Sequence, residues 1–253
     1  MSVFTHIPQL RLQPFIKSFV ITEGVQESSY TVLPGLSVVM GFQFKGSLSY
    51  INNDAEHSLS TAGVTGLLNS YRTFKNQANT GSVLVTFTET GAAHFFKAPM
   101  HQLFNGSYAL DDFIPYTEKA IILEKLSEAN SNVQRIQVVE DFLINTLEQN
   151  EADQLATAAI AYIKEANGII SITKLADHLN ISQSRLEKRF RAAVGASPKK
   201  FSSIVRFRHI VNQLSKTNSL TSLAYHAGYF DQAHFIKDFK TFTGQTPQQF
   251  ITK

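Results

Sequence analysis

The chain has 253 residues, of which 43% are hydrophobic, enough for one large domain or two ordinary ones with apolar cores. It contains no cysteine, which excludes disulfides, zinc–thiolate sites and cysteine nucleophiles. There is no secretory signal and no apolar run of about eighteen residues, so we expect a cytoplasmic protein that does not span a membrane.

The net charge of +3 hides an asymmetry along the chain. Residues 1–167 hold ten Lys and Arg against sixteen Asp and Glu, a net of −6, whereas residues 168–253 hold thirteen against four, a net of +9. A basic domain joined to an acidic one indicates a polyanionic partner for the basic half. A solvated basic surface is the alternative.

The first ninety residues have the pattern of short β-strands separated by Gly, Pro and Asn clusters. Apolar or alternating stretches predict strands at Ser18–Ile21, Leu36–Phe44, Ser47–Ile51, Val64–Ser70 and Ser82–Thr88. This spacing predicts an antiparallel barrel or sandwich. We expect a mostly apolar pocket for a small molecule among these strands.

Helical periodicity begins after Gly91. Apolar residues at intervals of three and four predict helices at Glu118–Ala129 and Asn132–Gln149. The second helix could form a dimer seam or pack onto its own domain. The polar stretch Glu148–Asp153 is the best domain boundary, so we divide the chain into residues 1–152 and 153–253.

The C-terminal part repeats one pattern twice. Six residues from Ser171 match six from Ser219 at an offset of 48, and one residue inserted in the turn makes the later offset 49. The later pairs include Leu186 with Phe235, Lys188 with Lys237, Phe190 with Phe239 and Gly195 with Gly244. So many paired positions indicate an internal duplication.

Each copy has the pattern of helix, turn and helix. Asn180 and Gly228 are residue types that tolerate the left-handed conformation of a tight turn. Ser182 and Asp231 follow, where they would cap the second helix. Between the copies, Ser197 and Pro198 begin what we expect to be one continuous helix to Lys216, which joins the two units rigidly.

The second copy contains the most specific motif of the chain. It runs Ala227-Gly228-Tyr229-Phe230-Asp231-Gln232-Ala233-His234-Phe235, followed by Phe239-Lys240, Gly244, Thr246-Pro247 and Phe250. Over about the last hundred residues the chain resembles the DNA-binding domain of AraC/XylS-type transcription regulators. The resemblance implies seven helices, with two helix-turn-helix units on a central helix. It also implies a bacterial regulator that places both recognition helices in successive major grooves.

The resemblance places base-reading side chains on the exposed faces of the two recognition helices. They are Ser184, Arg185 and Lys188 in the first copy and Ala233, His234 and Lys237 in the second. A Lys at either equivalent position would donate to guanine O6 and N7, and a phosphate contact is the alternative. Ser184 and Ala233 are smaller than the residues that family members commonly carry there.

A second set of polar side chains lies near the helix starts or beside the base-reading positions, where we expect contacts to phosphate. These residues are Thr173, Gln183, Arg189, Arg191, Thr221, Gln232 and Lys240. Free backbone amides favour phosphate beside Gln183 and Gln232. A solvated charge is the alternative for the basic members of the set.

The N-terminal half resembles a sensor domain of such regulators more weakly, through Phe87–Phe96 and Leu33-Pro34-Gly35. No characterised ligand follows from this resemblance. The many Phe residues and the β-rich pattern of the domain predict that it binds a small-molecule effector, whose identity stays open. His57, His94 and His101 show no H-x-H spacing, so we expect no metal and no cofactor.

Together these patterns predict an α+β chain with a β-rich sensor domain and an all-α DNA-binding domain. The helix-turn-helix motifs should lie at about residues 171–193 and 219–242. We predict a sequence-specific, effector-responsive transcription regulator of double-stranded DNA, with RNA polymerase and a second copy as further candidate partners. No enzyme motif is present, and we expect no enzymatic activity. The alternative is a helix-turn-helix protein that acts through protein–protein interaction, which the +9 charge disfavours.

Overall fold

The computed structural model describes residues 2–252 except 53–54, 149–150, 215–219 and 230. The strands are β1 (Ser2–His6), β2 (Ile16–Gly24), β3 (Ser28–Val32), β4 (Val39–Lys45), β5 (Leu48–Asn52), β6 (Ala55–Ser58), β7 (Ala62–Thr65), β8 (Arg72–Asn76), β9 (Thr80–Phe87) and β10 (Ser107–Ala109). The 3-10 helices are η1 (Gly91–His94), η2 (Met100–Leu103) and η3 (Leu110–Asp112). The α-helices are α1 (Tyr116–Glu128), α2 (Asn132–Thr146), α3 (Gln154–Glu165), α4 (Ile172–His178), α5 (Gln183–Val194), α6 (Pro198–Leu214), α7 (Leu220–His226), α8 (Gln232–Thr243) and α9 (Pro247–Ile251).

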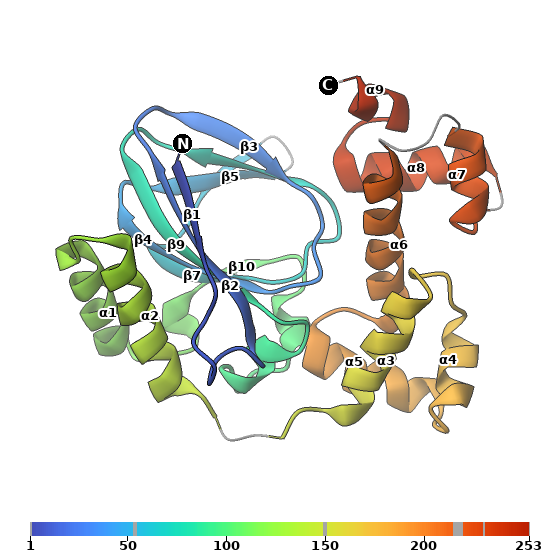
Figure 1. Ribbon diagram of the computed structural model, residues 1–253, viewed down its shortest axis with the longest axis horizontal. Helices are drawn as coiled ribbons and strands as arrows, with labels where there is room; N and C mark the ends of the chain where they lie inside the picture. Colours follow the sequence, from blue (N-terminus) through green and yellow to red (C-terminus); the bar gives the residue numbers. More distant parts are fainter. Residues whose placement is uncertain (1, 53–54, 149–150, 215–219, 230, 253) are drawn as a thin grey trace.

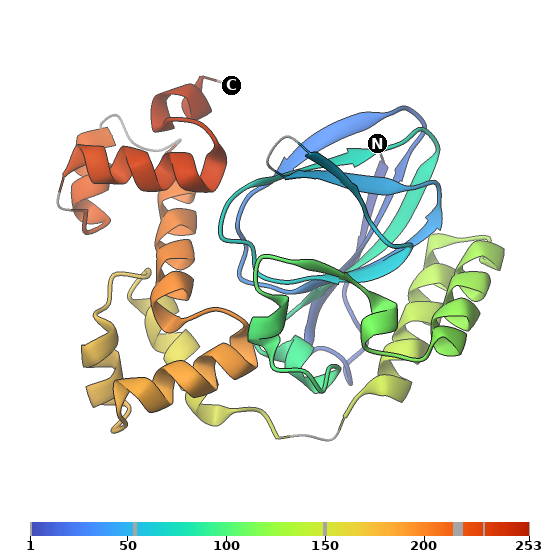
Figure 2. The same ribbon diagram turned by 180° about the vertical axis from the view of Figure 1, so that it is seen from behind.

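The strands form two antiparallel sheets, and the C-terminal helices lie beside them on the side away from α1 and α2 (Figure 1, Figure 2). One sheet has the order β1-β2-β9-β4-β7-β10 and the other β3-β8-β5-β6. The predicted α+β class, with a β-rich N-terminal part and a helical C-terminal part, is confirmed.

The six-stranded sheet presents one apolar face to the first helices. Its register sets Phe19 beside Val85 and Val85 beside Met40, so that alternate residues of three strands form one buried layer. Burial of each such side chain contributes about 1.5–3 kcal/mol. The ring of Phe42 meets Phe142 of α2 at a centroid distance of 5.9 Å.

Helix α2 packs onto its own domain. Ser131 caps it by accepting a hydrogen bond from the backbone amide of Gln134, and Ile136, Val139 and Leu143 are buried. Val133, in the first turn of the helix, is 68% exposed. The expected helix ends at Gln149 and Lys216 lie outside the described residues, as do Ser219 and Phe230 of the repeat.

Two features of the sandwich differ from the expectation. The predicted strand Val64–Ser70 starts two residues earlier and ends at Thr65. The next residue, Gly66, lies so close to Leu103 that a Cβ would stand 1.9 Å from its carbonyl oxygen. Strands β1, β3, β6, β8 and β10 were not predicted. Several of them are short, polar and largely exposed, so they lack the apolar run that marks a strand.

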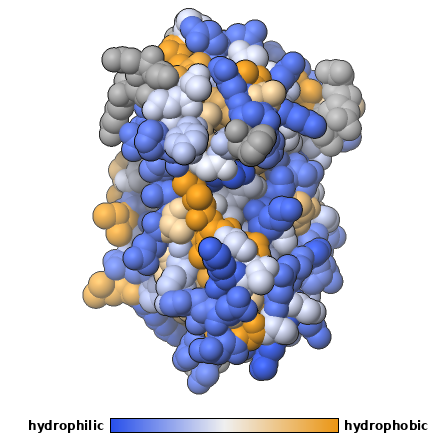
Figure 3. Space-filling view, turned by 90° about the vertical axis from the view of Figure 1, so that its right-hand side faces the viewer, coloured by the Kyte–Doolittle hydropathy of each residue, from blue (hydrophilic) through white to orange (hydrophobic). Residues whose placement is uncertain are grey.

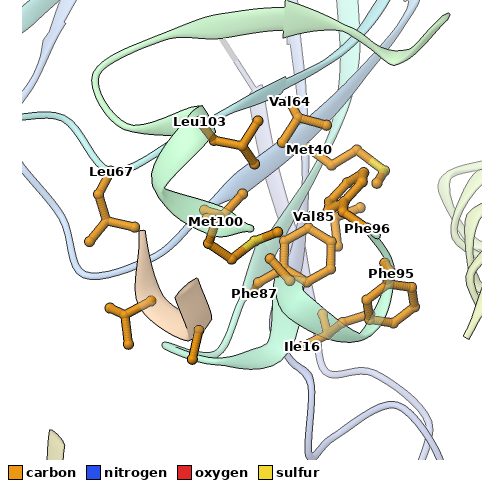
Figure 4. Packing of buried hydrophobic residues seen from close by; sticks show 14 of the residues in the cluster. Ile16, Met40, Val64, Leu67, Val85, Phe87, Phe95, Phe96, Met100 and Leu103 are labelled. Carbon is orange, nitrogen blue, oxygen red and sulfur yellow. The ribbon is translucent and has the colours of Figure 1, made fainter. Parts of the chain in front are cut away.

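The helical domain contains α3 to α9, seven α-helices within the described part of residues 153–253. Its first helix-turn-helix unit shares a continuous hydrophobic cluster with the sandwich, and Figure 4 shows Met100 and Leu103 of η2 in this cluster with Met40 and Val64. A second cluster, centred on Phe207, Phe235 and Phe239, forms the core of the second unit. None of the described helices is long and apolar enough to cross a membrane.

Candidate DNA-binding surface

The first helix-turn-helix unit consists of α4 and α5. Asn180 adopts the left-handed conformation in the turn, with φ of 53°. Ser182 then caps α5, and its hydroxyl accepts a hydrogen bond from the amide of Arg185 at 3.3 Å. Leu186 and Phe190 are fully buried and fix the orientation of the helix. The predicted turn and cap of this unit are therefore both present.

The polar face of α5 is exposed. The structure brings Ser184, Arg185 and Lys188 together on this face, with Arg191 one turn further along. Arg191 stands 3.9 Å from Glu187, an exposed pair that contributes little. All three base-reading candidates of the first unit are thus accessible from one side of the helix.

Arg189 is held differently from the other candidates. Its guanidinium donates two hydrogen bonds of 2.9 Å to the carboxylate of Asp153, which also caps α3 by accepting from Ala156. Burial raises the pKa of Asp153, but Arg189 and the backbone amide lower it by more, so it lies below its ordinary value. Arg189 therefore joins α5 to α3 within the domain.

Two phosphate candidates meet at the start of the first unit. The hydroxyl of Thr173, near the N-terminus of α4, lies 3.3 Å from the side-chain carbonyl oxygen of Gln183, the first residue of α5. Both residues are exposed. The contact places them at one edge of the unit, where free helix amides favour an anion.

The second unit repeats this arrangement with α7 and α8. Gly228 has φ of 73°, and Asp231 caps α8 by accepting a hydrogen bond of 2.7 Å from the amide of His234. Phe235 and Phe239 are buried, as Leu186 and Phe190 are in the first unit. The exposed residues of this unit include Thr221, Gln232, Ala233, His234, Lys237 and Lys240.

The equivalent lysines, Lys188 and Lys237, are both exposed. Within the described part of the chain, neither ammonium group has an ion pair or a hydrogen bond. His234 differs, because its ring lies 3.8 Å from the carboxylate of Asp238. Figure 3 looks onto the outer side of the helical domain, which is mostly hydrophilic with an apolar strip that runs downward from its centre.

Helix α8 is fastened to the central helix α6 by a polar cluster. Arg206 of α6 stands 3.6 Å from Asp238 of α8 and lies over the ring of Tyr229 at 4.3 Å. Burial raises the pKa of Tyr229 to about 12, which keeps its hydroxyl protonated beside Asp238. The second recognition helix is therefore held by both apolar and charged contacts.

The sequence did not identify the residues of a cavity of about 850 Å³ between the two sheets. Leu84 and Val20 of the six-stranded sheet line one wall, and Tyr30, Tyr50 and Phe74 line the other. The rings of Tyr30 and Phe74 stack at 5.8 Å. The alternating pattern of β9 could have indicated one wall of the cavity, because Ser82, Leu84 and Thr86 face away from the packed core. The opposite wall comes from strands that are distant in the sequence.

One polar group in the cavity wall has no partner. Ser82 is 1% exposed, and its hydroxyl makes no hydrogen bond within the described residues. A buried hydroxyl without a partner costs about 1–3 kcal/mol, and the oxygen of Ser82 is shielded from the cavity as well as from solvent.

Charged residues of both domains also line the cavity. Lys17 of β2 and Lys164 of α3 lie 2.9 and 2.7 Å from the same oxygen of Glu89, and Arg208 of α6 lines the cavity as well. Burial raises the pKa of Glu89, but the two ammonium groups lower it by more, and its pKa lies below the ordinary value. The described part of the chain contains no cluster of three or more His, Asp or Glu side chains placed to hold a metal ion.

Two families match the chain. Residues 175–253 match a helix-turn-helix domain family, and residues 4–108 match a domain family of unknown function, DUF6597. The curated relatives include an uncharacterized HTH-type transcriptional regulator of Staphylococcus aureus, 27% identical over 133 residues, which are 51% of this chain and 18% of that protein. Another, from Haemophilus influenzae, is 28% identical over 130 residues, 49% of this chain and 44% of that protein. The chain thus spans about a fifth of the first relative and less than half of the second.

Solved structures include similar proteins. ToxT from Vibrio cholerae is 10% identical, with a TM-score of 0.47, and the match covers 100% of this chain and 98% of ToxT. The C-terminal domain of AraT from Geobacillus stearothermophilus is 22% identical, with a TM-score of 0.38, over 41% of this chain and 89% of that domain.

The paired units on a central helix define a tandem helix-turn-helix protein. With the family match at residues 175–253, the C-terminal part of the chain contains a helix-turn-helix domain, similar to that of AraC-type regulators. The resemblance inferred from the repeat is confirmed.

Proposed function

We propose that the chain is a sequence-specific DNA-binding transcription regulator without enzymatic activity that acts in the cytoplasm. Residues 153–253 bind double-stranded DNA, and residues 1–152 are the sensor. The observation that carries the proposal is the exposure of two equivalent polar faces, each on a capped and well-seated recognition helix.

The base-reading side chains in this proposal are Ser184, Arg185, Lys188, Ala233, His234 and Lys237. Their exposure supports the assignment, and the two lysines are the strongest members because their ammonium groups are accessible at equivalent positions. Phosphate contacts come from Thr173, Gln183, Arg191, Thr221, Gln232 and Lys240. Arg189 is the weakest member of this phosphate set, since its hydrogen bonds go to Asp153, whose carboxylate offsets its charge.

The sensor binds a small molecule in the cavity between the sheets. The volume of about 850 Å³ and the stacked rings of Tyr30 and Phe74 in its wall support this assignment. RNA polymerase and a second copy of the chain are further proposed partners. Exposed Val133 on α2 is compatible with contact to a second copy.

Binding to DNA upstream of the gene, measured against random DNA of equal length, tests the function. We expect a preference of at least about 1000-fold at physiological salt, as specific regulators show. Equal affinity for both DNAs would contradict the proposal.

A ligand screen by thermal shift tests the sensor. Leu84→Trp should fill the cavity and abolish any stabilisation that a ligand gives, whereas Val25→Trp, at a position 78% exposed, should leave it intact. If no compound of a broad screen stabilises the protein and the chain is dimeric, the N-terminal domain has an oligomerising role instead.

A further inference from the structure

Gly195 and Gly244 occupy equivalent positions of the repeat and end the two recognition helices. Both are left-handed C-caps, with φ of 100° and 77°. The N-terminal domain covers each of them. A Cβ on Gly195 would lie 3.1 Å from the carbonyl oxygen of Met100, and a Cβ on Gly244 would lie 2.7 Å from the ring of Tyr71. One domain therefore contacts both helix-turn-helix units at the same point of the repeat.

The contact with the first unit is apolar and buried. Met100 of η2 is 1% exposed and belongs to the same cluster as Val194 and Ala196, which flank Gly195. Helix α5 packs against η2 and η1. The C-terminal end of the first recognition helix is thus seated in the core of the sandwich.

The contact with the second unit is made by two loops. Tyr71 lies in the loop after β7, and its ring covers Gly244. Leu33 and Leu36, on either side of the Pro34-Gly35 turn, pack against the hydrophobic cluster of the second unit. The C-terminal end of the second recognition helix is therefore also held by the N-terminal domain.

Among the described residues, α6 is the helix that connects the two units along the chain, and bending or rotation about it would change the placement of α8 relative to α5. Both recognition helices direct their C-terminal ends to the sandwich and their N-terminal ends to the opposite side, as the two ribbon views agree. Contacts at both C-terminal ends would restrict such motion and present the two N-terminal ends together to DNA.

On the basis of the function proposed above, we propose that the N-terminal domain is a clamp that sets the relative orientation of the two recognition helices through Met100 and Tyr71. The clamp pre-organises both helices for simultaneous binding, so its release lowers affinity for DNA that carries both half-elements. Affinity for DNA with a single half-element is unchanged.

The clamp is connected to the cavity. Leu33 and Leu36 line the cavity as well as contacting the second unit, and Gly66 and Leu68 line it from the loop that carries Tyr71. Gly66 also lies against the carbonyl of Leu103 in η2, the helix that contains Met100. A ligand that displaces these loops would therefore act on both contacts of the clamp.

Distance measurement between two spin labels tests the clamp without DNA. The chain has no cysteine, so Ala192→Cys on α5 and Thr241→Cys on α8, two exposed and equivalent positions, provide the only labelling sites. We expect one narrow distance distribution in the otherwise unchanged protein and one about twofold broader when Tyr71→Ala is added. Two control substitutions should leave the distance distribution narrow. They are Tyr71→Phe, which keeps the ring, and Tyr116→Ala on α1, at a position 69% exposed.

Binding of the unlabelled variants to DNA provides the second readout. Tyr71→Ala should weaken binding to DNA with two half-elements by about tenfold, because the second contact then forms at a lower effective concentration. Its affinity for one half-element should not change. An unchanged label distribution, or equal or tighter binding to the two-element DNA, overturns the clamp. If no protein binds DNA specifically, the proposed function fails, and the label distances still decide the clamp.

Discussion

Lys164 of the DNA-binding domain and Glu89 of the N-terminal domain form an ion pair of 2.7 Å, and Lys17 contacts the same carboxylate oxygen at 2.9 Å. Glu89 is largely buried, whereas the two lysines are partly exposed. The pair joins α3 to the segment after β9 beside the cavity. It is a charged link between domains that also meet through apolar side chains.

Glu89→Gln should therefore lower the free energy of unfolding at pH 7 by about 1 kcal/mol, a figure reduced for the exposure of the lysines. The pKa of Glu89 in the folded protein lies below its ordinary value. Its contribution to stability is therefore complete above the pKa of the unfolded state and is lost as the pH falls through the pKa of the folded state. Urea unfolding at pH 7 and near pH 3 should show the difference between the two proteins shrinking in acid. Glu56→Gln, which breaks the exposed pair with Lys75, is the control and should have a smaller effect. If Glu89→Gln lowered the free energy of unfolding equally at both pH values, the result would contradict this account.

Gly244→Ala should destabilise the protein by about 1–2 kcal/mol, because the residue is left-handed and alanine is strained there. The ring of Tyr71 adds a clash, since it lies 2.7 Å from the position of the new Cβ. Addition of Tyr71→Ala should remove the clash and recover part of the lost stability, which chemical unfolding measures. Gly35→Ala, where the new Cβ would meet nothing within 4 Å, should be nearly neutral. Simple additivity of the two substitutions would show that the ring is not in the way.

Lys188→Ala and Lys237→Ala should each weaken binding to the cognate site by about 1–3 kcal/mol if the lysines read bases. Affinity for random DNA should fall much less. Fluorescence anisotropy with both DNAs measures the difference, and Lys125→Ala on α1 is a matched control. Equal losses on cognate and random DNA would show that the lysines contact phosphate.

Binding should weaken steeply with salt. The basic half has enough Lys and Arg for about six phosphate contacts, which predicts a slope of roughly −5 in a plot of log affinity against log salt concentration. Titration at several salt concentrations gives this slope directly. A slope near zero would exclude DNA as the partner of the basic face.

Local features of the fold could be predicted from the sequence. The caps at Ser182 and Asp231 and the left-handed turns at Asn180 and Gly228 depend on residue types within a few positions of each other. The repeat supports the assignment of these caps and turns, because each feature occurs twice. This is why the tandem helix-turn-helix domain was predictable almost in full.

Contacts between distant residues could not be predicted in this way. Arg189 is 36 residues from Asp153, and only the packing of α5 on α3 brings them together. The cavity walls likewise come from strands of different sheets, and the contact between Tyr71 and Gly244 joins two domains. Each of these features depends on tertiary structure that no local pattern records.

The central claim is that one chain carries two readers of DNA. Footprinting of the full chain on its upstream DNA, together with the mass of the complex, tests it most directly. The account predicts one chain on two unlike half-elements about 10 base pairs apart, without a palindrome, because successive major grooves on one face lie roughly 34 Å apart. The half-elements differ because Ser184, Arg185 and Lys188 face one and Ala233, His234 and Lys237 face the other. A two-fold symmetric footprint that is occupied only by two chains would contradict the account.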